Sequence, residues 1–421
     1  MKNYNEFFLD LKNLISFKSV LGEAKENMPF GEECYKALNY FLSLAEKFGF
    51  STVNYDNYAG EIIIGNGEEV GIIGHLDVVP ATNGWTYDPY ALTEKDGKLI
   101  GRGVVDDKSS LLICLYALKE LKDSGVKFNR KIRLIVGCNE ETGWKDIEYL
   151  KTKTTLPEYG FSPDGNFPLS YAEKGMYYFV LHLPRFELFE SLSGGTAVNS
   201  VCDLATIKQK GKTNDYLLKK YDLIFDGEKI ISKGVAAHGS SPHKGVNAFK
   251  NLFLYMRDAG ENLGDLPEIL FLDKLGVFDF INEQGQTTFS PNLIKPTEDG
   301  FDLYCDLRLP APFTIEQIIP TLNNFGTAYT ITEKHPPVMV EKDGWFVQTL
   351  RKSYEDATGK DGTPASMGGS TFARAFKKGC AFGPDDGIHA GGCHKTDEYI
   401  EKDYLLSCYD IYKNTILNLI K

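Results

Sequence analysis

A histidine and an aspartate stand two residues apart, at His75 and Asp77, directly after the apolar stretch Gly71–Gly74. The stretch predicts a short buried strand, and side chains two positions apart on an extended segment point to the same side. A histidine that binds a metal through one ring nitrogen needs a hydrogen-bond partner for the other, and a carboxylate is a common one. The spacing therefore allows the two side chains to cooperate, with His75 as a candidate metal ligand and Asp77 as a candidate partner for its second ring nitrogen.

Four more residues of ligand-forming types follow apolar segments or glycine-rich turns: Asp106, Glu141, Asp164 and His394. Together with His75 they provide two imidazoles and three carboxylates, a donor set that suits zinc, manganese or cobalt. Five groups are too many for one tetrahedral ion, but they fit two ions that share a bridging carboxylate. The residue types therefore favour a two-metal site of the kind that catalyses hydrolysis.

The elements that must position these residues alternate between helix and strand in the first part of the chain. Apolar periodicity predicts helices over residues 6–19, 31–48 and 111–121, and strands over 61–65, 71–74 and 131–137. A Gly-Asn-Gly turn lies between the first two strands. Acidic residues stand at the strand ends, and α/β sheets bind ligands outside the carboxyl ends of their strands. We therefore predict an α/β domain with the site at the edge of the sheet where the carboxyl ends of the strands lie.

The pattern changes at about Tyr177. Strands are predicted over residues 177–183, 222–225, 229–236 and 302–309, and the first helix among them is expected near Val246. Helices and glycine-rich turns return beyond about Val340, and the chain ends in a predicted helix over 402–420. We therefore predict a discontinuous catalytic domain, residues 1–177 and 341–421. The inserted domain, residues 178–340, is expected to be α+β with helices on one face of a sheet.

Composition restricts the classes of function. The 421 residues allow two domains, and 42% hydrophobic with 13% aromatic residues is typical of a globular protein. A net charge of −12 without a basic block argues against nucleic acid as a partner. No apolar run reaches the length of a membrane span, and the N-terminus lacks a signal-peptide core. Eight cysteines without a Cys-x-x-Cys pair predict reduced thiols in a cytoplasmic protein.

The motifs resemble a known family along nearly the whole chain. His75-Leu-Asp77, Gly103-Val-Val-Asp106-Asp107-Lys108, Glu140-Glu141, Pro163-Asp164 and His394 are similar to five metal-site motifs of the di-zinc aminoacylase–carboxypeptidase–dipeptidase metallopeptidases. Residues 85–90, Gly101–Gly103 and His394-x-x-Asp397-Glu398 resemble the bacterial dipeptidases of the PepV type. The resemblance implies an α/β catalytic domain, a mixed sheet flanked by helices as in zinc peptidases, with an inserted α+β lid domain.

The resemblance also implies a role for each motif. One ion would be held by His75 and Asp164, the other by Glu141 and His394, and Asp106 would bridge them. Glu140 would be the general base that takes a proton from the metal-bridging water. In this family the peptide bond after the bridging aspartate is typically cis, which is the Asp106–Asp107 bond here.

Further residues resemble those that bind the substrate. His238, within Gly234–Ala248, is similar to a lid histidine that stabilises the oxyanion. Asn199 and Arg308 resemble lid residues that contact the substrate backbone or carboxylate. The loop 368–374, with Gly369, Ser370 and Arg374, resembles the loop that receives the C-terminal carboxylate of the peptide.

Some of these residues also have a purely structural interpretation. Asp106 or Asp107 is placed where a helix N-cap belongs, and Arg308 could form an ion pair on the surface of a strand. Ser370 replaces a glycine of the family's carboxylate loop. The insertion is also shorter than the PepV-type lid, so the sequence leaves a monomer and a homodimer open.

The sequence thus predicts a metallopeptidase that uses two divalent ions, with zinc as the first choice, to hydrolyse dipeptides or short peptides through a bridging hydroxide. An N-acyl amino acid deacylase or desuccinylase of the same family is the first alternative, because it would use the same metal site. The two differ at the amino end of the substrate, where a dipeptidase needs a carboxylate to meet a free ammonium group and a deacylase does not. A non-catalytic metal-binding protein on this fold is the second. A small peptide, and neither nucleic acid nor a membrane, is the expected partner.

Overall fold

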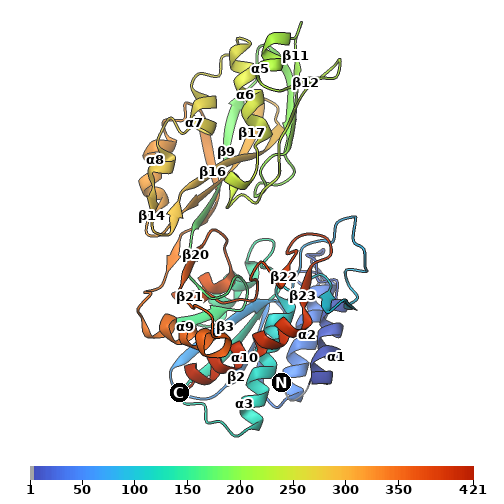
Figure 1. Ribbon diagram of the computed structural model, residues 1–421, viewed down its shortest axis with the longest axis vertical. Coiled ribbons are helices and arrows are strands. Elements are labelled where there is room, and N and C mark those ends of the chain that lie inside the picture. Colours follow the sequence, from blue (N-terminus) through green and yellow to red (C-terminus); the bar gives the residue numbers. More distant parts are fainter. Residues whose placement is uncertain (1–3) are drawn as a thin grey trace. The chain divides into compact units, whose positions relative to one another are not determined.

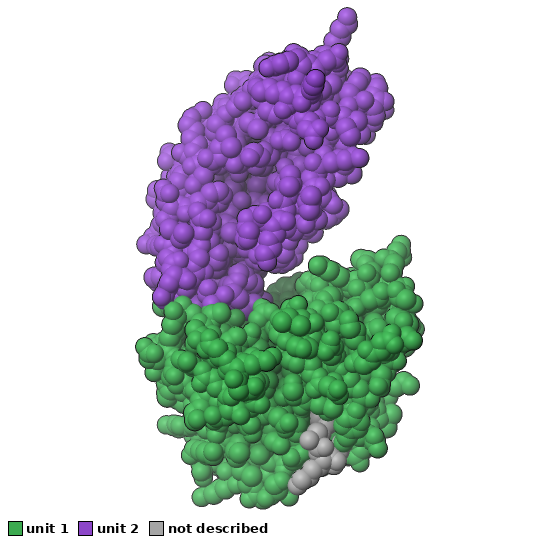
Figure 2. Space-filling view, viewed as in Figure 1, with its two compact units in different colours: residues 1–171, 339–365, 371–421 green, residues 172–338, 366–370 purple. Residues whose placement is uncertain are grey.

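The chain forms two compact units in the computed structural model, which describes residues 4–421 (Figures 1 and 2). Unit 1 comprises the described residues up to Tyr171, together with Met339–Ala365 and Thr371–Lys421. Unit 2 comprises Ala172–Val338 and Ser366–Ser370. It thus begins six residues before the expected boundary at 177/178. The sequence did not indicate the return of residues 366–370 to unit 2, where the Ser366 hydroxyl donates to the Gln284 carbonyl at 2.9 Å.

Unit 1 contains most of the helices. They are α1 (Tyr4–Ser16), α2 (Glu32–Lys47), α3 (Lys108–Asp123), α4 (Lys145–Lys153), α9 (Trp345–Thr358), α10 (Lys402–Leu419) and the 3₁₀ turn η3 (Phe372–Ala375). Its strands are β1 (Ser51–Tyr55), β2 (Ala59–Ile64), β3 (Glu69–His75), β4 (Thr93–Lys95), β5 (Lys98–Ile100), β6 (Lys131–Gly137), β7 (Tyr159–Ser162), β21 (Lys378–Ala381), β22 (Ala390–Gly391) and β23 (Tyr399–Glu401). Three strands cross the unit boundaries: β8 (Ser170–Glu173), β19 (Val338–Met339) and β20 (Ala365–Met367).

The large sheet is mixed, with the order β1-β2-β6-β3-β7-β21-β8-β19. Its centre, β6, β3, β7 and β21, is parallel, whereas β1 and β2 form an antiparallel edge. The turn between β2 and β3 does not make a hairpin, because β6 lies between these two strands. A smaller sheet has the order β22-β23-β5-β4. The predicted α/β class with a mixed sheet is confirmed.

Close packing on both faces explains the glycines of β3. A Cβ atom on Gly74 would lie 2.2 Å from the carboxylate of Asp107 at the start of α3. A Cβ atom on Gly71 would lie 2.2 Å from the ring of Phe376, just beyond η3 on the opposite face. The helix α3 packs against β3 and against α1 and α10. Only glycine lets the strand carry His75 between two such closely packed layers.

Unit 2 is an eight-stranded antiparallel sheet with helices. The strands are β9 (Gly175–Pro184), β10 (Phe189–Gly194), β11 (Leu204–Gln209), β12 (Ile224–Phe225), β13 (Ile230–Lys233), β16 (Thr288–Pro296), β17 (Gly300–Leu309) and β18 (Ala328–His335), in the order β12-β13-β11-β10-β16-β17-β9-β18. The helices are α5 (Asp215–Lys220), α6 (Ala248–Asp258), α7 (Leu266–Leu272), α8 (Ile315–Leu322) and the 3₁₀ turns η1 (Pro242–Lys244) and η2 (Val277–Asp279). A short hairpin joins β14 (Ile281–Asn282) to β15 (Gly285–Gln286).

One face of this sheet carries the core, because side chains alternate along each strand. The core contains residues 301, 303, 305, 307 and 309 of β17, with apolar residues of α5, α6, α7 and α8. The even-numbered residues of β17, among them Asp306 and Arg308, point to the other face. The expected α+β character with helices on one face is therefore confirmed.

The prediction of the first helix of unit 2 is wrong, and several strands of its sheet were not predicted. The first helix is α5, not the helix near Val246, and the side chain of Asn214 caps it by accepting the N–H of Leu217. Asparagine before an apolar pair was a readable N-cap signal. The predicted strands also do not include β10, β11, β16 and β18, of which β16 contains Pro291, a residue type that is rare inside sheets. The register between β16 and β17 shifts at Pro291, and this irregularity accommodates the proline.

No helix within residues 4–421 combines the length and the apolar character needed to cross a bilayer.

Candidate functional site

Three neighbouring parallel strands bring candidate ligands to one edge of the large sheet. His75 is the last residue of β3, while Glu141 follows β6 and Asp164 follows β7. Because β3 pairs in parallel with both β6 and β7, the carboxyl ends of all three strands meet at this edge. Asp106 comes from the loop before α3, and His394 from the loop between β22 and β23. All five residues belong to unit 1.

The five residues form two groups of three that share Asp106. In the first group, Nε2 of His75 lies 3.0 Å from Oδ1 of Asp106 and 3.8 Å from Oδ2 of Asp164. In the second, Nε2 of His394 lies 3.1 Å from Oδ2 of Asp106 and 3.0 Å from Oε2 of Glu141. Within each group the donor atoms lie within 4.8 Å of one another. The two oxygens of Asp106 thus serve different groups.

The electrostatics of the site favour the arrival of positive charge. Burial, with the charge of Asp106 next, raises the pKa of Asp164 to about 8. The same two causes raise the pKa of Glu141. Hydrogen bonds to Asp106 and Glu141 raise the pKa of His394 to about 11. The pKa values of these carboxyl groups and of the imidazole are raised in part by neighbouring carboxylates, so the site holds an excess of negative charge that a divalent cation can neutralise.

Asp77 supports both the histidine and the glutamate pair. The Nδ1 atom of His75 lies 3.0 Å from the backbone carbonyl oxygen of Asp77 and 3.4 Å from its carboxylate, so the expected carboxylate contact is the longer one. The same carboxylate accepts the backbone N–H groups of Glu140 at 3.1 Å and Glu141 at 3.0 Å. The sequence did not reveal this second role. Asp77 therefore fixes the turn that separates the two adjacent glutamates.

Glu140 and Glu141 take different positions although they are neighbours. Glu141 reaches His394, whereas Glu140 belongs to neither group of three. Burial raises the pKa of Glu140 well above its ordinary value, and the charges of Asp164 and Glu141 raise it further. Glu140 thus adjoins the candidate ligand Glu141 without belonging to a ligand group itself. Its carboxylate is therefore free of the ligand role and is a candidate proton acceptor.

The peptide bond between Asp106 and Asp107 is cis, as the resemblance implies. Asp107 occupies the N-cap position of α3, but its side chain makes no capping hydrogen bond. The interpretation of this aspartate pair as an ordinary helix cap is therefore wrong for both side chains.

A buried aspartate, Asp146, supports the strand end that leads to the glutamates. Its carboxylate accepts the backbone N–H groups of Cys138 at 2.7 Å and Asn139 at 2.8 Å. Burial, with the charge of Asp77 next, raises the pKa of Asp146 to about 7. The native chain thus binds a proton here over a pH range in which the unfolded chain, with a pKa near 3.8, does not.

The raised pKa of Asp146 predicts how the free energy of unfolding depends on pH. The contribution is fully present below about pH 4 and is lost as the pH rises through 7. The metal-free wild type should therefore lose a few kcal/mol of unfolding free energy between pH 4 and 8 relative to Asp146→Asn, at about 1.4 kcal/mol per pKa unit. Urea unfolding of both proteins across this range measures the difference. Parallel stability profiles would contradict the prediction.

The predicted oxyanion residue lies in unit 2 beside another predicted substrate residue. The N–H of Gly239, next to His238, donates to the backbone carbonyl of Asn199 at 2.7 Å. The Nδ1 atom of His238 accepts the N–H of Ser240 at 3.2 Å. An Nδ1 atom that accepts this hydrogen bond places the hydrogen of a neutral ring on Nε2. His238 can therefore donate a hydrogen bond through Nε2.

Arg308 is held in a buried ion pair on the helix-free face of the unit 2 sheet. Its Nε and Nη2 atoms donate to the two carboxylate oxygens of Asp306 at 2.7 and 3.0 Å, and Nη2 also donates to the hydroxyl of Tyr178 at 3.3 Å. Arg308 is only 2% exposed, so a surface ion pair is the wrong description. Among residues 4–421 its Nη1 atom has no partner, which leaves donors for a ligand carboxylate.

The predicted carboxylate loop is divided between the two units. Gly369 and Ser370 belong to unit 2, whereas Arg374 lies in η3 of unit 1. The hydroxyl of Ser370 is buried and has no hydrogen-bond partner within the described chain. The sequence presented the loop as continuous and did not show this division.

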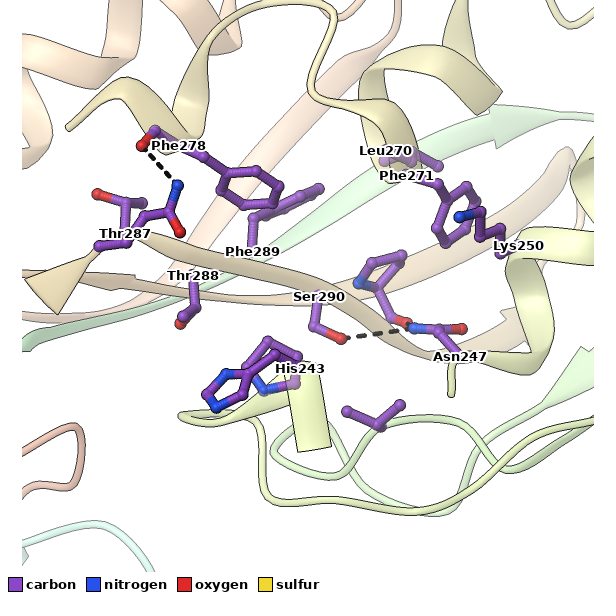
Figure 3. Close-up of a pocket in the computed structure, with 14 residues that line it drawn as sticks. His243, Asn247, Lys250, Leu270, Phe271, Phe278, Thr287, Thr288, Phe289 and Ser290 are labelled. Carbon is purple, nitrogen blue, oxygen red and sulfur yellow. Dashed lines mark hydrogen bonds between the residues drawn. The ribbon is translucent and has the colours of Figure 1, made fainter. Parts of the chain in front are cut away.

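Unit 2 also contains a cavity of about 400 Å³ that the sequence did not indicate. The polar side chains of His243, Thr288 and Ser290 lie on one side of β16, and the rings of Phe271 and Phe278 lie on the other (Figure 3). The amide of Asn247, which also lines the cavity, donates to the carbonyl of Pro291 at 2.7 Å. None of these residues belongs to the metal-binding groups.

Comparisons with known proteins agree with this geometry. Residues 71–418 match the profile of "Peptidase family M20/M25/M40". The chain is 33% identical over 465 residues to a Staphylococcus saprophyticus protein, covering 100% of this chain and 98% of the relative. It is 30% identical over 457 residues to a Bacillus subtilis protein, with the same coverage. Both relatives carry the name "Putative dipeptidase".

Solved structures show the same fold at low identity. Human carnosine dipeptidase 1 aligns with a TM-score of 0.62 at 15% identity, covering 99% of this chain and 97% of that one. The dipeptidase Dug1p of Saccharomyces cerevisiae aligns with a TM-score of 0.64 at 12% identity, covering 99% and 96%. Bacillus subtilis YXEP, titled a dinuclear metal-binding peptidase, aligns with a TM-score of 0.54 at 10% identity, covering 98% and 99%. The profile match and the full-length relatives together show that this chain is a metallopeptidase of the M20/M25/M40 family.

Proposed function

We propose that this peptidase is a two-metal-dependent dipeptidase that hydrolyses the peptide bond of dipeptides or short peptides. The observation that carries the proposal is the pair of three-residue groups that share Asp106. Two-metal hydrolases use paired ions about 3.5–4 Å apart, which a carboxylate with one oxygen in each group can bridge. The names of the Staphylococcus and Bacillus relatives support dipeptides as the substrate class.

The donor set fits two divalent ions. We assign one ion to His75, Asp106 and Asp164, and the other to Asp106, Glu141 and His394. Imidazole nitrogen and carboxylate oxygen are ligands of catalytic zinc, and manganese and cobalt accept the same atoms. When bound, such ions lower the pKa of water towards about 7 and polarise the scissile carbonyl group. We propose zinc as the first choice.

Glu140 is assigned the role of general base. It takes a proton from the attacking water and passes it to the leaving amine, so its carboxylate must be near the ligands without being consumed by them. Its place outside both groups and its raised pKa support this assignment. Asp77 assists by holding the backbone of Glu140 and Glu141 in the turn that separates their side chains.

The substrate contacts are assigned to residues that resemble those of the family. His238 donates through Nε2 to the developing oxyanion, and its Nδ1 contact with Ser240 supports this tautomer. Arg308 meets the substrate carboxylate with its Nη1 donors, and Asn199 contacts the substrate backbone. Gly369, Ser370 and Arg374 complete the recognition of the carboxylate. We also propose a cytoplasmic location, which the eight free cysteines support.

The test compares three substrates with protein reloaded with zinc or with manganese: a free dipeptide, its N-acetylated form and its C-terminal amide. Cleavage of the free dipeptide alone supports the proposal and implies a site for the ammonium group. Preference for the N-acetylated form moves the assignment to a deacylase or desuccinylase. Cleavage of the C-terminal amide at the same rate as the free dipeptide contradicts recognition of the substrate carboxylate by Arg308. Absence of cleavage of all three with either metal favours a non-catalytic metal-binding protein.

A further inference from the structure

A buried carboxylate outside the ligand set gathers the loop that carries Asp106. Glu398 has no solvent exposure. Its Oε1 atom accepts the backbone N–H groups of Val105 at 2.8 Å and Asp106 at 3.2 Å. Its Oε2 atom accepts the N–H of Gly103 at 3.1 Å and Nη1 of Arg102 at 2.7 Å. All four donors belong to the segment that ends at the shared ligand.

The same segment is tied back to the loop that carries the second histidine. The Nη2 atom of Arg102 donates to the carbonyl of Lys395, the residue after His394, at 3.0 Å. The N–H of Gly101 donates to the backbone carbonyl of Glu398 at 3.0 Å. Beyond this point β5 and β23 continue as an antiparallel ladder. The two loops, nearly 300 residues apart in the chain, are therefore joined by side-chain and backbone hydrogen bonds.

Charge explains why a carboxylate is needed at this place. Three convergent backbone N–H groups and a guanidinium require an acceptor with two anionic oxygens, which glutamate provides and glutamine does not. Arg102 is 1% exposed, so Glu398 also neutralises its buried charge. The neighbouring Asp397 has a different task, because its carboxylate accepts the N–H and the hydroxyl of Thr86 at 2.8 and 2.7 Å.

We propose that Glu398 is a positioning residue for the metal site, because it sets the distance between Asp106 and His394. The inference rests on the proposed function only in that it requires the metal-binding groups. The 3.1 Å approach of His394 Nε2 to Asp106 Oδ2 depends on two loops, and Glu398 is the acceptor at which they meet. Groups that hold metal ligands in place typically contribute about 10–100-fold to metal affinity.

Zinc affinity of the full-length chain tests the proposal without any substrate. The protein is stripped of metal and titrated with zinc in competition with a chromophoric chelator. We expect Glu398→Gln to weaken zinc binding by about 10–100-fold. Asp397→Asn is the matched control and should bind zinc within about 2-fold of the wild type. Asn suits this position because Asp397 has a φ of 54°.

A second variant keeps the experiment decisive if Glu398→Gln does not fold by circular dichroism. Glu398→Asp retains the charge beside Arg102 but withdraws the carboxylate by one methylene, so it cannot reach all four donors. It is also expected to weaken zinc binding by about 10-fold. A folded Glu398 variant with the zinc affinity of the wild type would overturn the proposal.

The metal titration and the dipeptide assay together show which of the two proposals fails. A wild-type chain that binds no zinc or manganese would overturn both. A wild-type chain that binds zinc but cleaves no dipeptide would overturn only the dipeptidase assignment, while a weakened Glu398→Gln variant would still support the positioning role.

Discussion

Replacement of Glu140 by glutamine is expected to lower kcat for dipeptide hydrolysis by about 10²–10⁴-fold, the usual contribution of a general base. Glutamine keeps the size of the side chain but cannot accept the proton of the attacking water. Glu140 belongs to neither metal-binding group, so the zinc content and zinc affinity should change little. Initial rates under saturating dipeptide, with metal analysis of the same samples, measure both effects.

Glu148→Gln is the matched control for this variant. It is the same substitution on an exposed residue of α4, eight positions along the chain, and it should retain wild-type activity. A Glu140→Gln enzyme that keeps full zinc content and more than a tenth of the wild-type kcat would show that another group accepts the proton. Loss of zinc together with activity would instead assign Glu140 to the ligand set.

The second large effect is expected for Asp106→Asn. Asp106 is the one residue common to both groups of three, and its two oxygens serve different groups. Asparagine offers one oxygen and one amide nitrogen, and the nitrogen cannot bind a metal. The zinc content should fall from two ions per chain to one, and kcat/KM should fall by about 10³-fold or more, since the ions supply several kcal/mol of transition-state stabilisation.

Elemental analysis after dialysis, combined with dipeptide assays, checks this expectation. Asp96→Asn is a suitable control, because the Asp96 side chain is 82% exposed and its φ of 51° is tolerated by asparagine. Retention of two ions by Asp106→Asn would exclude a shared ligand at this position. Retention of more than a tenth of the activity with one ion would exclude a mechanism that needs both.

The resemblance of the motifs to a known family predicted the family and the peptidase activity, and the order of strands and helices along the chain predicted the α/β class. Ligand types after apolar strands, at His75, Glu141 and Asp164, indicate a site at the carboxyl edge of a sheet, because strand ends are local features of sequence. The change from alternating helices and strands to several strands in succession likewise predicted the α+β character of unit 2. The sequence-based prediction does not include α5 or its N-cap Asn214, although an N-cap is a local signal too.

The sequence did not show which residues contact one another in the folded protein. The sequence indicated that the carboxylate of Asp77 would contact His75. In the structure this carboxylate also accepts hydrogen bonds from the backbone N–H groups of Glu140 and Glu141. The sequence also left Arg308 as a candidate for a surface ion pair; its partner Asp306 is only two positions away on β17, but tertiary packing buries the pair.

What the sequence by itself determined is therefore which groups stand at the ends of strands, since propensity and alternation are local. The tertiary structure decided that β6 lies between β2 and β3, and that Asp106 turns its two oxygens to different groups. It also decided that Glu398 accepts hydrogen bonds from the loop of Asp106, across a separation of 292 residues. Such contacts depend on distances of a few ångströms between loops, and these distances are set only when the sheet has formed.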